Sequence, residues 1–340
     1  MEKVVTFGEI MLKLSPLGYQ RFGQSDLFHT EYSGAEANVA ISLAHFNIPV
    51  SYVSKVPDQE IGTAAINAIR HYGVETDKVK RGEGRLGVYF SEKGASQRPS
   101  KVIYDRRNSV FAESSLSDYD WNQIFEGAEW FHFTGITPAL SDSLAEICLE
   151  ACKKAKEKGL TVSCDLNYRS KLWTREKASS VMMGLSPYID VCISNESDIS
   201  DIFGIKAANS DDDYDTVDDI AYSVVAQQLS DKFGIETVAI TLRQSISASD
   251  NVWSAILYDC GKTYYGKKYP IHIVDRIGGG DSFSAGLIYG FINKKGSQDI
   301  LDFAVAASCL KHSIEGDFNR VSVDEVEALV NGHKSGRIQR

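Results

Sequence analysis

Residues 275–286 read DRIGGGDSFSAG, and this stretch decides how the fold is interpreted. The consecutive glycines at 278–280 let the backbone turn tightly and aim several N–H groups at one point. A helical apolar period follows over residues 282–293, so the glycines lie at a helix N-terminus, where the helix dipole also favours an anion. Asp281 at the same terminus is placed to accept a proton from a hydroxyl that attacks a bound phosphate.

Two other interpretations of this stretch are open. Asp281 can be a plain helix N-cap after a tight turn, which involves no chemistry. A dinucleotide-binding fold would instead place a G-x-G-x-x-G pattern directly after the first strand. The chain has only Gly8-Glu9-Ile10 there, and its glycine run lies late, so an NAD-dependent oxidoreductase is the weakest alternative.

Composition limits the classes of function. The chain has 340 residues, of which 43% are hydrophobic, and this is enough for a large core. The net charge of −10 argues against a nucleic-acid partner, although one nest of amides can still hold a polyphosphate. No apolar run approaches the ~18 residues that span a bilayer, and we expect no membrane partner and no signal peptide. Six cysteines without a CxxC pair are expected to be buried thiols in a reducing cytoplasm.

Strand and helix patterns alternate along most of the chain. Short apolar runs predict strands at 4–10, 51–55, 130–134, 160–165, 190–194 and 237–242. Helical spacing predicts helices at 35–46, 61–71, 141–158, 282–293 and 299–312, and a capping box at Ser322 and Glu325 starts one more. This alternation is typical of an α/β fold with a parallel sheet covered on both faces.

Two segments break the alternation, and a third differs in composition. Residues 12–32 separate a strand from its helix with polar and aromatic sequence, and 85–107 read as a hairpin of two alternating runs. Together they predict a small sheet that covers a ligand at the carboxyl ends of the parallel strands. The acidic segment 209–219 is expected to be a solvated loop that leads into a helix.

The motif Asp275-x-x-Gly278-x-Gly280-Asp281 resembles the signature of the ribokinase-like carbohydrate kinases. Gly279 stands where the family usually has Ala, and this change leaves the cluster of backbone N–H groups in place. Residues 34–40, GAEANVA, are similar to the family's N-terminal signature. The resemblance covers the whole chain. It implies a single kinase domain at 1–340 with a three-layer α/β/α sandwich, a small β-sheet lid, ATP and Mg²⁺; it leaves a requirement for a monovalent cation such as K⁺ open.

Four segments resemble the branch of this family that phosphorylates 2-keto-3-deoxygluconate at its 6-hydroxyl. They are residues 86–90, 102–107, 165–169 and 241–248. The resemblance implies a substrate site at Gly34, Asn38, Tyr89, Tyr104, Arg106, Arg169 and Asp317. Tyr104 and Arg106 share one strand face, and a guanidinium matches a carboxylate as a two-pronged donor. A side chain at position 34 would fill the sugar pocket.

The resemblance also implies a nucleotide site. Its expected residues are Asn167, Arg169, Asn195, Thr241, Arg243, Ser245, Gly278 and Gly280. Asp198 replaces the family's glutamate and is expected to hold Mg²⁺ through water. Val305 stands where many members carry an Asn near the adenine, which leaves that contact open.

The implied mechanism has Asp281 as the base and the amides of Gly278, Gly279 and Gly280 as stabilisers of the transferring phosphoryl group. Arg106 and Arg169 would neutralise charge. Structural alternatives stay open at several positions: a surface pair of Arg106 with Asp105 or Glu92, aromatic lid packing by the two tyrosines, a loop acid at Asp317 and a helix cap by Asn195.

Rival functions differ in substrate or in class. The same chemistry on fructose, tagatose or a nucleoside is one rival, with fructokinase the nearest. A non-catalytic sugar-binding regulator is the other, although a mere binder has no need of a base at Asp281. Exposed lid strands have unpaired edges, so we expect a homo-oligomer, at least a dimer, formed through the lid.

Overall fold

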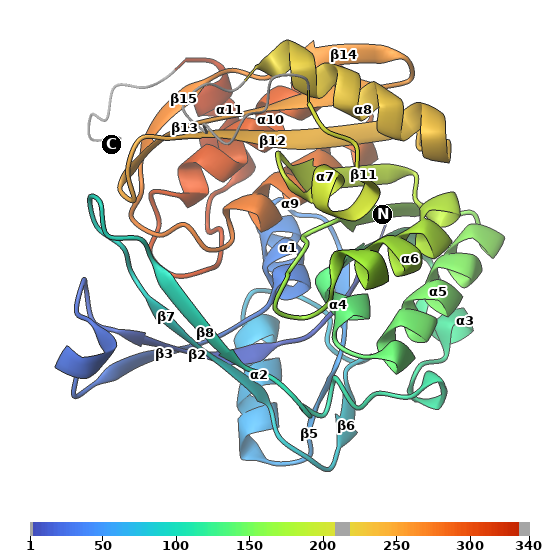
Figure 1. Ribbon diagram of the computed structural model, residues 1–340. Coiled ribbons are helices and arrows are strands. Elements are labelled where there is room, and N and C mark those ends of the chain that lie inside the picture. The colour runs from blue at the N-terminus through green and yellow to red at the C-terminus, as the bar shows by residue number, and fades with distance from the viewer. Residues whose placement is uncertain (1–2, 208–217, 333–340) are drawn as a thin grey trace.

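The computed structural model describes residues 3–207 and 218–332, and it has three layers (Figure 1). The central sheet has nine strands in the order β14-β13-β12-β11-β10-β9-β1-β4, with β15 paired to β13. They are β1 (Lys3–Phe7), β4 (Val50–Val53), β9 (Ala128–Thr134), β10 (Thr161–Asp165), β11 (Val191–Asn195), β12 (Thr237–Ser245), β13 (Asp250–Asp259), β14 (Lys262–Tyr265) and β15 (Tyr269–His272). The strands from β4 to β12 are parallel, and β13 to β15 add an antiparallel edge that the sequence did not predict.

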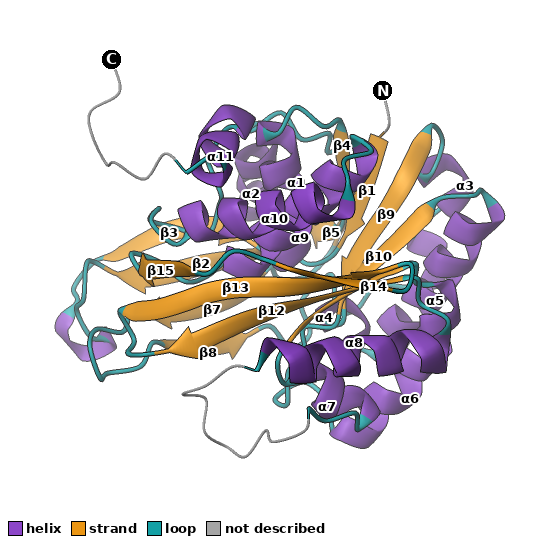
Figure 2. Ribbon diagram, turned by 90° about the horizontal axis from the view of Figure 1, so that it is seen from above, coloured by secondary structure: helices purple, strands orange, loops and turns teal. Residues whose placement is uncertain are grey.

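Helices cover both faces of this sheet (Figure 2). One face carries α1 (Ala35–His45), α2 (Glu60–Arg70), α9 (Gly279–Ile292), α10 (Ser297–Lys311) and α11 (Val323–Val330). The other face carries α3 (Trp121–Ile124), α4 (Ile136–Ala139), α5 (Asp142–Glu157), α6 (Arg175–Leu185), α7 (Asp198–Phe203) and α8 (Asp219–Phe233). Each helix layer therefore packs one apolar core against the sheet.

The helix signals in the sequence have direct structural counterparts. The capping box at Ser322 and Glu325 is present at the start of α11. The side chain of Ser141 accepts a hydrogen bond from the amide of Leu144 and begins α5, whose apolar face is buried. Three 3-10 turns, Phe22–Gln24, Leu116–Asp118 and Ser186–Tyr188, complete the helical structure of the described residues.

A second, four-stranded sheet projects from the body (Figure 1). Its order is β3-β2-β7-β8, formed by β3 (Phe28–Ser33), β2 (Met11–Pro16), β7 (Gly87–Glu92) and β8 (Lys101–Asp105). A two-stranded sheet of β5 (Lys55–Pro57) and β6 (Lys80–Gly82) lies at its base. The three-layer fold with a small lid sheet is thus confirmed.

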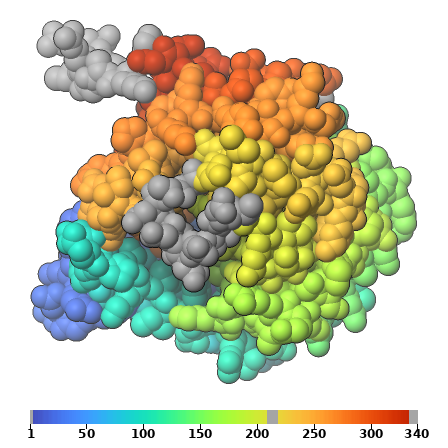
Figure 3. Space-filling view, turned by 45° about the horizontal axis from the view of Figure 1, so that its top comes forward, coloured from blue at the N-terminus to red at the C-terminus, as the bar shows by residue number. Residues whose placement is uncertain are grey.

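Buried polar contacts anchor the lid to the body. Lys13 on β2 is buried and forms ion pairs with Asp317, which lies after α10, and with Glu31 on β3. Burial opposes the charge on Lys13, but the carboxylates around it outweigh burial and raise its pKa. The tip of the lid hairpin also meets the β12–β13 turn, where the amide of Ala248 donates to the carbonyl of Ser96 at 2.7 Å (Figure 3).

Several expectations need correction or lie outside the described residues. Strand β1 ends at Phe7 rather than at residue 10, because the chain turns away there. Two cysteines are not buried: Cys260 is exposed in the β13–β14 turn, and Cys309 on α10 is half-buried. The acidic segment 209–219 falls mostly outside the described residues, and only its end, which caps and begins α8, can be compared. None of the described helices is both long enough and apolar enough to cross a membrane.

The glycine turn begins α9 and packs tightly against the end of α10. Gly278 has a φ of 83°, and a Cβ built on it would lie 2.0 Å from the backbone oxygen of Asp317. A Cβ on Gly279 would lie 2.5 Å from Cε1 of His312. The glycine at 279, where the family usually has Ala, is therefore matched by a bulky ring at 312 in this chain.

This contact predicts a coupled pair. Gly279→Ala should destabilise the fold by about 1–3 kcal/mol through overpacking against His312, measured by urea denaturation. Gly280→Ala is the matched control, because the nearest atom to its Cβ position is a carboxylate oxygen of Asp165 at 4.0 Å.

His312→Ala should remove most of the penalty of Gly279→Ala when the double variant is compared with His312→Ala alone. Equal penalties at 279 and 280, or an additive double variant, would contradict this explanation.

Candidate active site

A cavity of about 620 Å³ lies between the lid and the carboxyl ends of the parallel strands. It is lined by every residue proposed for the site from sequence except Asp198: Gly34, Asn38, Tyr89, Tyr104, Arg106, Asn167, Arg169, Asn195, Thr241, Arg243, Ser245, Gly278, Gly279, Gly280, Asp281 and Asp317. The segments that supply them are far apart in the sequence, and the fold brings them to one place.

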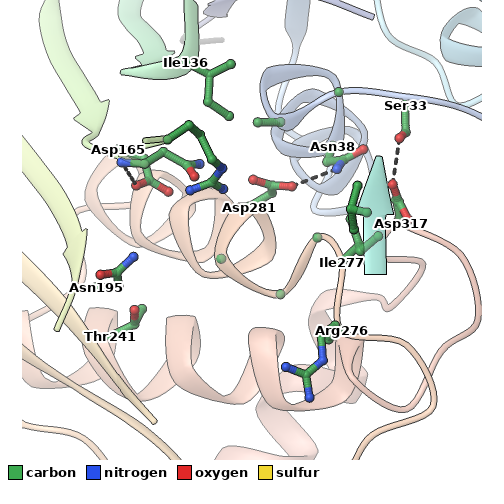
Figure 4. Close-up of a pocket in the computed structure, with 18 of the residues that line it drawn as sticks. Ser33, Asn38, Ile136, Asp165, Asn195, Thr241, Arg276, Ile277, Asp281 and Asp317 are labelled. Carbon is green, nitrogen blue, oxygen red and sulfur yellow. Dashed lines mark hydrogen bonds between the residues drawn. The ribbon is translucent and has the colours of Figure 1, made fainter. Parts of the chain in front are cut away.

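Asp281 lies at the start of α9 in the middle of this cavity, with Asn38 on one side and Asp165 on the other (Figure 4). The side-chain amide of Asn38 on α1 donates a hydrogen bond of 2.7 Å to Oδ2 of Asp281. Burial raises the pKa of Asp281 to about 7, and the charges of Glu36 and Asp317 add to this effect. The Asn38 hydrogen bond and the Arg169 charge lower the same pKa, so this carboxylate is poised to take up a proton near neutral pH.

The turn before Asp281 presents amides that are not used by the protein. Within the described residues, no group accepts a hydrogen bond from the amides of Gly278, Gly280 or Asp281. The amide of Gly279 is partly used, because it donates a long 3.4 Å bond to the carbonyl of Arg276. Free amides at a helix N-terminus form a binding site for an anion such as a phosphate.

Two lid tyrosines and an arginine close one side of the cavity. The rings of Tyr89 and Tyr104 stack at 5.7 Å, and the guanidinium of Arg106 lies 5.6 Å from the Tyr104 ring centre. Arg106 is buried and pairs with Glu9, with Nε 2.7 Å and Nη2 2.5 Å from Oε2. The partners Asp105 and Glu92 that the sequence left open belong instead to Arg85 and Arg98.

Gly34 has a different role from the one that the sequence suggested. It lines the cavity, but a Cβ on it would lie 1.9 Å from the carbonyl oxygen of Glu9. Backbone packing between the start of α1 and the segment after β1 therefore requires a glycine here, whether or not the sugar needs the same space. Its φ of −175° is extended backbone that any residue adopts.

Asp317 is committed to the lid. Its Oδ2 accepts a 2.7 Å hydrogen bond from Ser33 and another from the Tyr89 hydroxyl, and its Oδ1 pairs with Lys13 (Figure 4). It lines the cavity, yet its oxygens are already occupied by these protein groups. The loop-acid interpretation of Asp317 is therefore replaced by that of a lid anchor.

The opposite side of the cavity holds the residues expected to meet a nucleotide. Asn195 caps α7, since its Oδ1 accepts from the amides of Ser197 at 2.9 Å and Asp198 at 3.0 Å. Asn167 has a left-handed φ of 42°, and its amide donates to Oδ1 of Asp165 at 3.2 Å. Asparagine tolerates this conformation better than most side chains do.

The guanidinium groups of two arginines at this end form no ion pair within the described residues. Arg243 and Arg276 both line the cavity. The Glu196 carboxylate accepts a hydrogen bond from the backbone amide of Arg243, and the Asp275 carboxylate lies near enough to act on the charge of Arg276. Burial, together with the charge of Arg243, lowers the pKa of Arg276. Two cations that repel each other in one cavity predict an anionic ligand between them.

Asp198 lies behind the cavity. It is buried, and its Oδ2 accepts a 3.1 Å hydrogen bond from the amide of Tyr168. Burial raises its pKa to about 6, and Arg169 lowers it. Its neighbour Asp165 lines the cavity, and burial together with the charges of Asp198 and Asp281 raises the pKa of Asp165 well above its usual range. Val305 is buried in the core and does not line the cavity.

Sequence reasoning missed Glu9, Asp165 and Arg276. The strand predicted at 4–10 hid Glu9, because it placed that residue inside a regular element. Asp165 and Arg276 did carry a signal, since each adjoins a motif that was recognised, at the end of β10 and beside the glycine turn.

The chain is similar to known proteins over almost its whole length. The pfkB family carbohydrate kinase model matches residues 1–319. A crystal structure of 2-dehydro-3-deoxygluconokinase from Thermotoga maritima is 49% identical, covers 98% of this chain and all of its own, and superposes with a TM-score of 0.94. A 2-dehydro-3-deoxygalactonokinase of Haloferax volcanii is 32% identical over 98% of each chain. The 2-dehydro-3-deoxygluconokinase of Bacillus subtilis is 26% identical over 94% of this chain and 93% of its own.

The family match extends over most of the chain and includes both of the motifs that meet in the cavity. The base candidate, the free amides and the opposed arginines are the parts that transfer of a phosphoryl group to a sugar hydroxyl requires. The chain therefore belongs to the pfkB family of carbohydrate kinases.

Proposed function

We propose that this protein transfers the γ-phosphoryl group of ATP to the 6-hydroxyl of 2-keto-3-deoxygluconate. The observation that carries the proposal is the Asp281 carboxylate, held by Asn38 beside free helix N-terminal amides in a cavity lined by arginines. The names of the relatives from Thermotoga maritima and Bacillus subtilis support the choice of sugar acid. The Haloferax volcanii relative makes the galactonate epimer the first comparison substrate.

The proposed step uses groups that already lie in the cavity. Asp281 accepts the proton of the sugar hydroxyl as its oxygen forms a bond to the γ-phosphorus, and the bond from that phosphorus to the bridging oxygen of ADP breaks. The amides of Gly278, Gly280 and Asp281 face the charge on the transferring group, with a smaller contribution from Gly279. A pKa of about 7 suits a base that must be ionised at neutral pH.

Arg243 and Arg276 are proposed to hold the nucleotide phosphates. Neither guanidinium forms an ion pair among the described residues, and an anion between them would relieve their repulsion. Thr241 and Ser245 line the same side, and Asn195 and Asn167 complete it with amide groups. An ATP triphosphate would thus reach from the open end of the cavity to the glycine turn.

Mg²⁺ is proposed to bind beside the acidic residues on this side. The charges of Asp198 and Asp281 raise the pKa of Asp165, and the charge of Arg169 lowers the pKa of all three carboxyl groups. No group of three or more acidic, histidine or cysteine side chains in the described residues has the geometry to hold a metal ion. We propose that Asp165 and Asp198 hold Mg²⁺ through water, and that when bound it neutralises phosphate charge.

Arg106 and Arg169 are proposed to face the sugar carboxylate. Arg169 is half-buried and donates one hydrogen bond, of 2.9 Å, to the carbonyl of Tyr168. Arg106 keeps Nη1 for a ligand, because its bonds to Glu9 involve Nε and Nη2. The Glu9 pair also favours a second candidate, a neutral ketose such as fructose, since it cancels much of the Arg106 charge.

The remaining expectations are retained as proposals. We propose that residues 1–340 act as one kinase domain in the reducing cytoplasm, which agrees with the buried free thiols of Cys148, Cys152, Cys164 and Cys192. A homodimer through the lid is supported by apolar side chains that the lid exposes, with Leu27 at 68% and Ile103 at 52%. A single sedimentation-velocity run would measure the assembly.

Removing the base tests the proposed function. Asp281→Asn should lower kcat by ~10²–10⁴ with ATP and 2-keto-3-deoxygluconate, because an amide of the same size does not act as a base for the hydroxyl proton. ADP release over a panel of sugar acids and neutral ketoses is the measurement. A wild-type protein that binds sugars without releasing ADP would establish the non-catalytic regulator, and near-normal turnover of the variant would refute the role of Asp281.

The Asn38 hydrogen bond predicts a change in pH dependence. Because it lowers the pKa of Asp281, its loss in Asn38→Ala should raise that pKa. The base is inactive when protonated, so wild-type kcat should fall tenfold per pH unit below about 7, and this acidic limb should move to higher pH in the variant. Steady-state rates from pH 5 to 9 would show the shift, and an unmoved limb would contradict it.

The sugar class is tested at Arg106. If it binds a carboxylate, Arg106→Ala should raise KM for the sugar acid by ~10–100-fold and leave KM for a neutral ketose within a few-fold. Arg107→Ala is the matched control, because that neighbour is exposed and does not line the cavity. Equal effects of Arg106→Ala on both substrate classes would favour the neutral-sugar candidate.

A further inference from the structure

Lys311 is a fully buried lysine with no acidic partner. It is the last residue of α10 and is 0% exposed, whereas the other buried lysine of the described chain, Lys13, is surrounded by carboxylates. No carboxylate of the described residues lies within 4.0 Å of the Lys311 Nζ. Its Nζ donates instead to two backbone carbonyls, those of Asp275 at 3.3 Å and Ile314 at 3.4 Å.

These two carbonyls belong to the segments that shape the glycine turn. Asp275 begins the turn, and its carboxylate accepts hydrogen bonds from the amides of Ile277 at 3.3 Å and Gly316 at 3.2 Å. The Lys311 side chain also passes beneath Gly278, where Cε lies 3.3 Å from the position of a Cβ. The ammonium therefore ties the start of the turn to the 312–317 loop, and the methylene chain that carries it packs under the middle of the turn.

Burying the Lys311 ammonium at this position destabilises the fold unless neighbouring groups stabilise its charge. A buried ammonium with only carbonyl partners loses much of its hydration, and burial accordingly lowers the pKa of Lys311. Methionine would fill a similar space without that cost. The negative end of the α10 dipole and the nearby Asp275 and Asp317 carboxylates favour a cation here. Backbone carbonyl oxygens also coordinate K⁺, and a helix C-terminus favours any cation, so the same groups could hold a monovalent cation.

We propose that the Lys311 ammonium is a fixed internal cation that holds the phosphate-binding turn at 275–280 in shape, so that this kinase needs no added monovalent cation. Lys311 acts as a positioning residue, because it touches the turn from below and does not line the cavity. The inference rests on the proposed kinase activity, and it answers the question of K⁺ that the sequence left open.

The first test needs no variant. ADP release by the wild-type protein is measured with Mg²⁺ and tetramethylammonium as the only other cations, and again with K⁺, Na⁺ or NH₄⁺ added. The rate is expected to change by less than ~twofold, because the site is already filled by Lys311. A severalfold activation by K⁺ would overturn the proposal whether or not any variant folds.

The second test is chemical rescue. Lys311→Met and Lys311→Ala should each lower kcat at least ~10-fold, with KM for the sugar acid within a few-fold, because the turn loses its shape and the lid side does not. Only Lys311→Ala leaves room for a small cation, so NH₄⁺ or K⁺ should restore its rate and not that of Lys311→Met. Lys295→Met, at a half-buried lysine paired with Glu327, should behave as wild type in every salt.

The outcomes separate this proposal from the proposed function. Wild-type kcat in Lys311→Met, or equal rescue of both Lys311 variants, would overturn the role of Lys311. If no sugar acid is phosphorylated, the proposed function fails, and the role of Lys311 is then read from ADP binding by calorimetry. There, Lys311→Ala should bind ADP more weakly than wild type and recover with NH₄⁺, and unchanged affinity would overturn it.

Discussion

The site depends on close backbone packing at two glycines. The Cβ position of Gly34 falls on the carbonyl of Glu9, and that of Gly278 falls on the carbonyl of Asp317. These approaches seat the first turns of α1 and α9 against neighbouring backbone, and they bring Asn38 within 2.7 Å of Asp281. A larger side chain at either position would push one helix start away, and the carboxylate would lose the amide that holds it.

Charge is distributed unevenly around this packed centre. On the lid side, Lys13 and Arg106 are buried with carboxylates that occupy most of their donors. On the side proposed to hold the nucleotide, the guanidinium groups of Arg243 and Arg276 form no ion pair in the described chain, and Glu196 and Asp275 act on them only through space. Buried ion pairs keep their side chains in place, because breaking a pair leaves an unpaired charge in the interior. Cations without an ion pair instead attract an anionic ligand. The rigid side suits recognition of a sugar, and the open side suits binding and release of a nucleotide.

The sequence predicted most of the layered fold from local signals, and the family resemblance implied many of the residues that line the cavity. Apolar periodicity, capping boxes and glycine runs can each be recognised within a short stretch of consecutive residues. The motifs at 34–40 and 275–281 assigned Asn38 and Asp281 to one site through family resemblance. The antiparallel edge from β13 to β15 was not predicted from sequence. Which strands pair depends on contacts between segments, and no single segment encodes those contacts.

The hydrogen-bond and ion-pair partners of the cavity residues could not be predicted from neighbouring sequence. Arg106 has Asp105 beside it in sequence, yet it pairs with Glu9, which is far away in the chain and lies just beyond the end of β1. The side-chain oxygen of Asn195 accepts hydrogen bonds from amides at the start of α7. Both carboxylate oxygens of Asp317 are bonded to residues of the lid. Each of these residues lines the cavity, and its tertiary neighbours decide which of its atoms are still available to a ligand. Resemblance to a family therefore identifies where a side chain lies, whereas the hydrogen bonds that it already makes determine what it can still bind.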